Sequence, residues 1–199
     1  MDGTGGEKYF RVAGSTIPCG STLLNPAGVF VTFTRDGDCA YRIREKNGLT
    51  YTFENTAPTV GQQAKLLTIS DRNGNTLTLG YTNGLLTTVT DALQRSLTLQ
   101  YNAGNRLEEV RDFANRQHQY GYDASGNLTS YKNPLAVAGP QNPVIYTYYG
   151  TAPLAHVLAS YTLPRGNGMK FEYYLNGKVF RHCRFETAIP AACTDPTKT

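Results

Sequence analysis

A short apolar phrase returns six times along this chain. Each copy is an aliphatic residue followed three positions later by an aliphatic or aromatic one, and Asp or Asn usually stands two residues further on. The copies are Leu66/Ile69/Asp71, Leu86/Val89/Asp91, Leu107/Val110/Asp112, Leu128/Tyr131/Asn133, Leu158/Tyr161 and a degenerate Val179/His182, with starts 20, 21, 21, 30 and 21 residues apart. A period in the twenties indicates one supersecondary unit stacked on copies of itself, so the repeat constrains the architecture before any single residue is interpreted.

A second phrase keeps the same period and predicts strands. In Thr76 to Tyr81, the residues Leu77, Leu79 and Tyr81 alternate with polar ones, as in a half-buried strand. The equivalent residues elsewhere are Leu97, Leu99 and Tyr101; Tyr120 and Tyr122; Tyr146 and Tyr148; Phe171 and Tyr173. Turn residues separate the two phrases, so each unit is predicted to be strand, turn, strand, turn.

Composition agrees with strands and turns. Hydrophobic residues make up 40% of the 199 residues and include 14 Tyr and 8 Phe but no Trp, while 20 Gly and 10 Pro favour many turns. We therefore expect an all-β fold of tandem antiparallel β-hairpin repeats that form one continuous, curved or spiralling sheet.

The expected organisation has four parts. Residues 1–28 are Gly-rich and predicted to be irregular, and residues 29–65 read as lead-in hairpins, with strands at 29–33, 40–44 and 49–53, followed by a polar loop. The regular repeats occupy 66–184, and 185–199 form an irregular tail.

Certain residues are expected to build the repeat rather than to perform chemistry. Asp71, Asp91 and Asp112 stand where turns begin, so their side chains are predicted to accept hydrogen bonds from nearby backbone N–H groups instead of binding calcium or acting as paired carboxylates. Gly104 and Gly126 are expected to supply left-handed backbone in turns. Tyr81, Tyr101 and Tyr122 share a strand face with Leu, which favours packing.

Two local questions stay open from the sequence. Leu107 and Val110 are three residues apart, so a regular strand would place them on opposite faces; either a β-bulge reconciles them or both faces are partly buried. The segment Pro153 to Ala159 could form one helical turn, but Leu158 and Tyr161 continue the strand phrase, and we favour a strand there.

Charge and hydropathy exclude some classes of partner. The formal net charge is +4, and the basic residues are dispersed, so no nucleic-acid partner is expected. No run approaches the ~20 apolar residues of a membrane span, and Met1 to Gly6 show no export signal.

Four cysteines lie outside the regular repeats. Cys19, Cys39, Cys183 and Cys193 form no CxxC pair and permit two disulfides in three connectivities. Pairing of Cys183 with Cys193 would close a short loop, and pairing of Cys19 with Cys39 a longer one. Whether bridges form depends on the compartment, and a metal site is disfavoured because no His stands at ligand spacing from these thiols.

The sequence offers no catalytic, cofactor or metal site. His118, His156 and His182 have no nucleophile and orienting carboxylate at a recognisable spacing, so we interpret them as histidines on strand surfaces. The glycines sit singly in hairpin turns instead of opening a helix as a phosphate loop does. We expect no enzyme and no cofactor.

The turn strings resemble those of a known family. Asp71-Arg72-Asn73-Gly74-Asn75, Tyr101 to Leu107, and above all Tyr120-Gly121-Tyr122-Asp123-Ala124-Ser125-Gly126-Asn127-Leu128 are similar to the RHS repeats, also called YD repeats. These occur in bacterial polymorphic toxins, in the cocoon subunits of insecticidal toxin complexes and in teneurins. The resemblance covers about residues 29 to 184.

The resemblance implies a scaffold. In that family a long ribbon of antiparallel strands winds into a hollow shell that encloses a toxin polypeptide, which implies a polypeptide cargo or further RHS segments as partners and a secreted or cell-surface location. Complete members end the shell with an Asp-Pro-Gly-type self-cleavage segment, whereas Asp195-Pro196 is followed here by Thr197-Lys198-Thr199. Six units are few for closing a cavity, so we expect a fragment or a short member that assembles with something else.

The tyrosines carry an alternative function. Aromatic hairpin arrays of similar period, such as choline-binding cell-wall modules, bind ligands by stacking, and Tyr faces also stack on sugars. The alternative is thus a surface-exposed module that binds glycan or adheres through the same strands.

Overall fold

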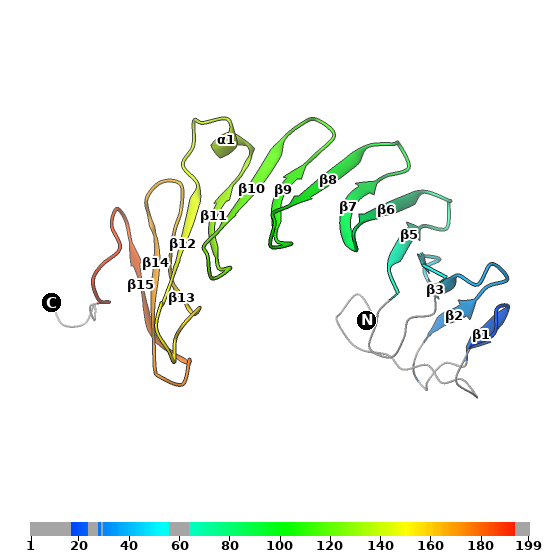
Figure 1. The fold of residues 1–199 in the computed structure, drawn as a ribbon, viewed down its shortest axis with the longest axis horizontal. Coiled ribbons are helices and arrows are strands. Elements are labelled where there is room, and N and C mark those ends of the chain that lie inside the picture. Colours follow the sequence, from blue (N-terminus) through cyan, green and yellow to red (C-terminus); the bar gives the residue numbers. More distant parts are fainter. Residues whose placement is uncertain (1–16, 24–27, 29, 56–63, 194–199) are drawn as a thin grey trace. The chain divides into compact units, whose positions relative to one another are not determined.

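The computed structural model describes residues 17–23, 28, 30–55 and 64–193. Within them lie fifteen strands and one four-residue helix (Figure 1). The elements are β1 (Ser21–Leu23), β2 (Val31–Arg35), β3 (Tyr41–Glu45), β4 (Thr50–Phe53), β5 (Leu66–Ser70), β6 (Thr76–Thr82), β7 (Leu85–Thr90), β8 (Ser96–Tyr101), β9 (Leu107–Arg111), β10 (Gln117–Tyr122), β11 (Leu128–Lys132), α1 (Pro134–Val137), β12 (Val144–Tyr148), β13 (Leu158–Thr162), β14 (Gly168–Tyr173) and β15 (Val179–Phe185).

The strands follow one another in the sheet in chain order, from β1 to β15. Each pairing with a defined register is antiparallel, from β1 with β2 to β14 with β15. This arrangement confirms the prediction of an all-β fold built from tandem antiparallel hairpins. The chain forms two compact units, an N-terminal unit of Met1–Thr98 and a C-terminal unit of Leu99–Thr199, and the division falls within β8.

In the N-terminal unit, the register separates an apolar face from a hydroxyl face. Ile69 lies opposite Leu77 and Tyr51, and Leu79 lies opposite Val89. On the other face, ten Thr and Ser side chains align across five strands: Thr50, Thr52, Thr68, Ser70, Thr76, Thr78, Thr88, Thr90, Ser96 and Thr98. Neighbouring hydroxyls are hydrogen-bonded, at 2.8 Å for both Ser70–Thr76 and Thr90–Ser96. The alternation of Thr with Leu in the sequence therefore becomes two chemically different faces.

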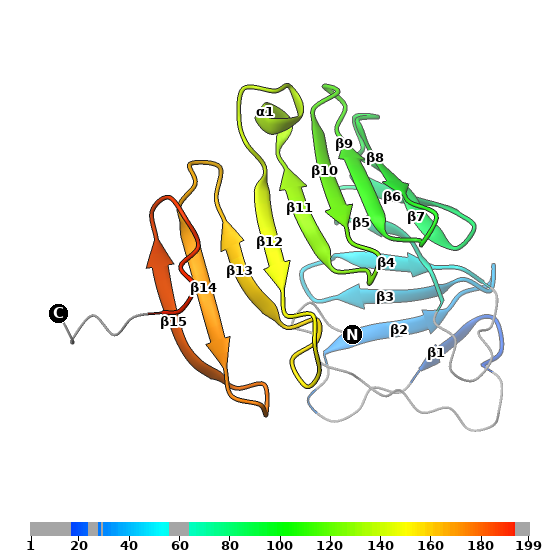
Figure 2. The same ribbon diagram turned by 60° about the vertical axis from the view of Figure 1, so that its left-hand side comes forward.

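In the C-terminal unit, strands β9 to β15 lie side by side in chain order (Figure 2). One face carries aromatic rings, since Tyr120 is opposite Tyr131 and Tyr146 is opposite Tyr161. The other face carries polar and charged side chains, because Gln119 is opposite Lys132 and Glu172 is opposite Arg181.

A β-bulge recurs at one place in the repeat. Tyr81 pairs with Leu86 but Gly80 pairs with Thr88, so Thr87 is an extra residue on its strand. The corresponding extra residues of the other hairpins are Leu67, Thr129, Ala159 and Phe180. An extra residue shifts the strand's alternation by one. In the five copies of the repeated phrase that contain such a bulge, the two residues three apart thereby face the same side.

Nine five-residue turns in the described part of the chain share one backbone pattern. The first residue's N–H donates to the carbonyl of the fifth, and the fourth residue's N–H donates to the carbonyl of the first. The fourth residue always has a left-handed φ; these residues are Cys39, Gly48, Gly74, Gln94, Asn105, Asn115, Gly126, Gly166 and Gly177. Asn and Gly tolerate that conformation best, which explains their recurrence at this position.

This pattern corrects the predicted role of one glycine. Gly104 is the third residue of its turn and is not left-handed; Asn105, the fourth, has φ of 57°. The fourth position in each turn takes the left-handed conformation, whichever residue occupies it. Gly126 does take it, with φ of 86°.

Two loops differ from the simple repeat. The insertion after β11 contains α1, and Asn133 caps this helical turn by accepting a hydrogen bond from the Ala136 N–H at 2.9 Å. The segment predicted as strand from Pro153 begins its strand only at Leu158. His156, predicted to lie on a strand, instead lies in this loop with φ of 68°.

Little of the described chain is fully buried. The buried hydrophobic side chains there are Leu23, Ala40, Ala136, Phe185 and Cys193, and the buried polar one is Ser160. Most side chains of the repeat strands are half-buried instead. The stability of each hairpin therefore depends on cross-strand neighbours within the sheet rather than on a thick core.

The described residues include only part of the predicted four-part organisation. Most of residues 1–28 and the last six residues of the tail 185–199 lie outside the described residues, although β1 occupies Ser21–Leu23 in the first of these segments. The boundaries at 28, 65 and 184 stay predictions.

Candidate functional site

A row of rings runs across the aromatic face of the C-terminal unit. It consists of His118, Tyr120, Tyr131, Tyr146, Tyr161, Phe171 and His182, which we call the aromatic row. Ring centroids are 5.5 Å apart for Tyr120 and Tyr131 and 6.2 Å apart for Tyr161 and Phe171. Such spacings are those of packed aromatic pairs, which contribute beyond the area they bury. The row extends over the strands from β10 to β15.

The tyrosines beside the bulges have a different role. The hydroxyl of Tyr81 donates to the carbonyl of Leu66 at 2.9 Å, and that of Tyr122 donates to the carbonyl of Leu107 at 2.8 Å. Tyr148 repeats the contact with the carbonyl of Leu128 at 2.9 Å. The carbonyl belongs each time to the first residue of an earlier copy of the repeated phrase, so each ring joins one hairpin to the hairpin before it.

Aspartate carboxylates accept hydrogen bonds from backbone N–H groups of the turns that they begin. One oxygen of Asp71, Oδ1, accepts hydrogen bonds from the backbone N–H groups of Asn73 and Asn75, at 2.8 and 2.9 Å, and Oδ2 accepts one from the Asn75 side chain. Asp91 and Asp112 repeat this arrangement, with arginine side chains on Oδ2. Asn102 makes the same two backbone contacts without a charge. The geometry is that of an Asx turn, and it engages the side-chain oxygens that a metal would need.

These contacts lower the pKa values of the turn aspartates. The side chain of Asn75 and backbone N–H groups lower the pKa of Asp71 below its usual value, and the backbone N–H of Arg95 is the main cause for Asp91. In the β2–β3 turn, hydrogen bonds from Arg42 and from the Ala40 N–H lower the pKa of Asp38 to about 2. Hydrogen bonds to the ionised form favour it, so these carboxylates stay charged in mildly acidic solution.

The polar face of the C-terminal unit contains a shallow hollow of about 320 Å³. It is lined by Gln100, Glu108, Glu109, Gln119, Tyr120, Gly121, Ser130 and Lys132. Glu109 already forms an ion pair with Arg111 at 2.8 Å. The lining brings no histidine or cysteine near Ser130, so it provides no activated nucleophile of the usual kind.

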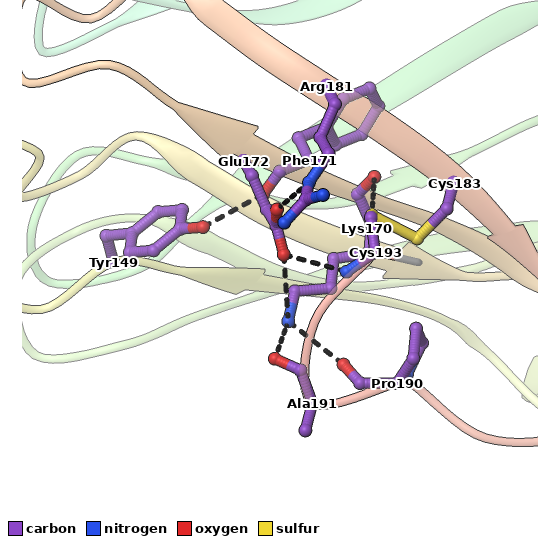
Figure 3. Close-up of a disulfide and its surroundings, with 9 residues drawn as sticks. All are labelled: Tyr149, Lys170, Phe171, Glu172, Arg181, Cys183, Pro190, Ala191 and Cys193. Carbon is purple, nitrogen blue, oxygen red and sulfur yellow. Dashed lines mark hydrogen bonds and ion pairs between the residues drawn. A yellow bond between two sulfur atoms is a disulfide. The ribbon is translucent and has the colours of Figure 1, made fainter. Parts of the chain in front are cut away.

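After β15 the chain folds back over the polar face of β14. We call residues 186–193 the strap (Figure 3). The ammonium group of Lys170 donates to the carbonyls of Pro190 and Ala191, and a carboxylate oxygen of Glu172 accepts from the N–H of Cys193 at 2.8 Å. A disulfide joins Cys193 to Cys183 on β15, with Cα atoms 5.5 Å apart.

Glu172 is the centre of this arrangement. Its second oxygen accepts from Nε of Arg181 at 2.5 Å, and Lys170 lies 3.9 Å from the first. The hydrogen bond from Arg181, followed by that from the Cys193 N–H, lowers the pKa of Glu172. A charged carboxylate thus fastens the strap to β14 and β15 together.

A second disulfide lies in the N-terminal unit. Cys19 is bonded to Cys39, with Cα atoms 4.7 Å apart, and Cys39 is the left-handed residue of the β2–β3 turn. The bridge ties the segment before β1 to the turn that follows β2. Of the three connectivities that the sequence left open, the structure has the two sequential bridges.

The repeat identifies the family. Residues 82–117, which run from the end of β6 through the start of β10, match the family model of the RHS repeat. This segment of the chain is an RHS repeat. No curated protein matches the chain. The matched RHS segment contains three of the nine turns. Two of them begin at Asp91 and Asp112, and the third begins at Asn102 between them.

The RHS repeat accounts for the position of each residue singled out from the sequence. Asp71, Asp91 and Asp112 begin turns, Tyr81 and Tyr122 contact backbone carbonyls, and Tyr101 ends β8. The residues that the sequence did not reveal are the strap contacts Lys170 and Glu172, because only the folded register brings them to the tail. Their charge pairing along one face of β14 was the only signal available.

The histidines make local contacts. Nδ1 of His118 is hydrogen-bonded to the hydroxyl of Tyr131 at 2.7 Å, and Nδ1 of His156 to Oδ1 of Asn127 at 2.9 Å. In the described part of this RHS chain, no group of three or more His, Cys, Asp or Glu residues is placed to hold a metal ion. Nor does any helix among the described residues have the length and apolarity to cross a membrane.

Proposed function

We propose that this RHS chain is a structural segment of a β-shell that encloses or presents a toxin or effector polypeptide, in bacterial competition or pathogenesis. The observation that carries the proposal is the RHS repeat itself, built here as hairpins paired in chain order. A wall of paired strands satisfies its own backbone and leaves broad side-chain faces for contact with another polypeptide.

The aromatic row is the surface through which the chain holds its cargo. Its rings are half-buried, except that of His182, which is exposed, and together they offer an apolar area to a segment without a core of its own. The opposite face of the same strands is polar and is partly covered by the strap. A polypeptide kept unfolded exposes apolar side chains, which the aromatic face accepts better than the polar one.

The two disulfides support a location outside the cytoplasm. Bridges between Cys19 and Cys39 and between Cys183 and Cys193 persist in oxidising environments. We therefore propose a secreted or cell-surface protein. Mass spectrometry of the protein purified from its natural source would show both bridges if this is right and four free thiols if it is not.

Binding of a permanently unfolded protein tests the cargo proposal. Reduced and carboxymethylated α-lactalbumin should associate saturably, whereas folded α-lactalbumin should not. Tyr161→Ser should weaken the association about tenfold or more because it removes a ring from the row. Ile145→Ser removes an exposed apolar side chain from the opposite face and should leave the association unchanged. Absence of saturable association with the unfolded protein would refute the proposal.

The same rings favour glycan binding as a second candidate, since tyrosine faces stack on sugars. A glycan array with purified protein separates the two functions. Saturable glycan binding that is lost in Tyr120→Ala without unfolding, together with no affinity for unfolded protein, would establish the adhesive module instead.

A further inference from the structure

The outer edge of β15 is the longest strand edge that the described sheet leaves open. β15 is last in the strand order and pairs with β14 over six residue pairs, from Gly168↔Phe185 to Tyr173↔Val179. At the other end of the order, β1 has three residues, whereas β15 has seven. An open edge presents a row of backbone N–H and C=O groups, and natural proteins commonly shorten or cover such edges. β15 is not shortened.

Exposed apolar side chains surround this edge. Val179 and Phe180 at the start of β15 are 52% and 49% exposed, and Tyr174 and Leu175 in the turn before it are 54% and 76% exposed. The rings of Tyr174 and Phe180 are 5.0 Å apart in an edge-to-face arrangement. Four neighbouring apolar side chains on one hairpin tip form a contact patch, unlike a single exposed leucine.

The edge is also basic. β15 contains Arg181, His182 and Arg184 and no acidic residue, and Lys178 stands just before it. Of the two nearby acidic residues, Glu172 is engaged by Arg181 and by the Cys193 N–H, and Glu186, directly after β15, is exposed; the three basic side chains of Lys178, Arg181 and Arg184 outnumber them. Arg184 and Lys178 are exposed. The charge of the edge is therefore positive.

This charge selects the partner. A second copy of the chain would bring the same basic residues together across the new pairing, which costs free energy. An extended segment with alternating acidic and apolar residues would instead bring carboxylates to this basic edge and apolar side chains to the hairpin tip. Basic residues on an edge thus oppose self-pairing and favour an acidic strand.

The strap makes the edge rigid. The bridge between Cys183 and Cys193, and the bonds from Lys170 and Glu172 to the strap, hold β15 against β14 on the face opposite the aromatic row. A strand fixed in this way loses little conformational entropy when another strand pairs with it.

We propose that the edge of β15 binds an extended acidic segment of a partner polypeptide, which joins the sheet as an additional antiparallel or parallel strand. This goes beyond holding a cargo on the aromatic row, because the contacts are backbone hydrogen bonds and ion pairs at an edge. The recognition mode is β-augmentation, in which main-chain bonds give affinity and alternate side chains give specificity.

Peptide binding tests the proposal. A fluorescein-labelled eight-residue peptide that alternates valine with glutamate should bind saturably in an anisotropy titration. The matched peptide with lysine in place of glutamate should bind at least about tenfold more weakly, as should a version with central prolines that cannot pair. In hydrogen exchange, the glutamate peptide should slow the amides of residues 179–185.

Two charge reversals separate this site from general attraction to a basic protein. Arg184→Glu, in the edge, should weaken the glutamate peptide about tenfold or more, and Arg72→Glu, in the exposed β5–β6 turn, changes the net charge equally and should not. Far-UV circular dichroism verifies that both variants fold. If a variant does not fold, hydrogen exchange of the unaltered protein with the glutamate peptide still tests the site. Association with carboxymethylated α-lactalbumin through the aromatic row should survive Arg184→Glu, so the two proposals fail separately.

Several results would overturn the proposal. These are the absence of saturable binding by the glutamate peptide, equal weakening by both charge reversals, protection confined to strands other than β15, or a dimer of the chain whose β15 amides are protected without peptide.

Discussion

The hydroxyl of Tyr122 donates a hydrogen bond to the backbone carbonyl of Leu107, fifteen residues earlier, at 2.8 Å. Tyr81 makes the same contact with Leu66 at the same separation in sequence. A side chain therefore fastens each hairpin to the start of its predecessor, in addition to the strand ladder. In a repeat array, such contacts between neighbours supply much of the stability.

Tyr122→Phe should lower the free energy of unfolding of its hairpins by about 1 kcal/mol, because the Leu107 carbonyl loses its partner while the ring stays. Hydrogen exchange of the β9–β11 amides measures this locally. Tyr120→Phe serves as the control, since the packing of its ring on Tyr131 does not require the hydroxyl. Equal effects of the two substitutions would contradict a specific role for the Tyr122 hydroxyl.

Gly126→Val should destabilise the β10–β11 hairpin by roughly 1–3 kcal/mol, because Gly126 has φ of 86° and a branched side chain there is strained. A Cβ atom at this site would also meet the guanidinium group of Arg106. Gly104→Ala, in a turn of the same kind but outside the left-handed region, should cost much less. Thermal denaturation compares the two, and a larger loss for Gly104→Ala would show that the fourth-position rule is wrong.

Acid should weaken the turns. The pKa values of Asp71, Asp91, Asp112 and Asp123 are lowered in the folded chain, so their contribution to stability is complete above the ordinary aspartate value of 3.8 and is lost as pH falls through the lowered values. For Asp38 the loss extends down to about pH 2. Urea denaturation at a series of pH values from 6 to about 2.5 should show this decline.

The native Asn102 provides the control for that titration. It makes the two backbone contacts of an aspartate without ionising. Replacing Asp71, Asp91, Asp112 and Asp123 together by Asn should therefore flatten the acid dependence while the fold is kept at neutral pH. An undiminished decline in this variant would mean that other carboxylates control acid unfolding.

Removing the strap bridge should loosen the end of the sheet. The double variant Cys183→Ser, Cys193→Ser should lose about 2–3 kcal/mol, as expected for a short closed loop, with faster amide exchange in β14 and β15. The Cys19–Cys39 bridge lies in the other unit, so exchange in β2 and β3 should be unaffected. Uniform acceleration across both units would contradict a local role for the strap.

The regular features of the fold could be predicted from the sequence because they follow from local periodicity. Alternation in Thr76 to Tyr81 gave strand β6, and Asn83-Gly84 gave its two-residue turn, with both residues left-handed as that hairpin requires. The hydrogen bonds of the aspartates that begin turns could be predicted for the same reason, since an Asx turn involves backbone N–H groups only two and four residues away.

Features that depend on register could not be predicted. The bulge at Thr87 is defined by which residues of β6 and β7 face each other. A three-residue spacing alone, as between Leu107 and Val110, therefore left two explanations. The prediction that Gly104 is left-handed was wrong, because the turn places its left-handed residue one position later, at Asn105. The contact of Glu172 with Cys193 joins residues 21 apart through a reversal of the chain that no local pattern indicates.

The most direct test of the account is hydrogen exchange of the protein with and without carboxymethylated α-lactalbumin, read at the amides of the strands that carry the aromatic row. We predict saturable association and slower exchange in β10, β11, β13 and β14, both reduced in Tyr161→Ser and unchanged in Ile145→Ser. Unaltered exchange in these strands at saturating unfolded protein, or slowing only in the presence of a glycan, would contradict the scaffold function.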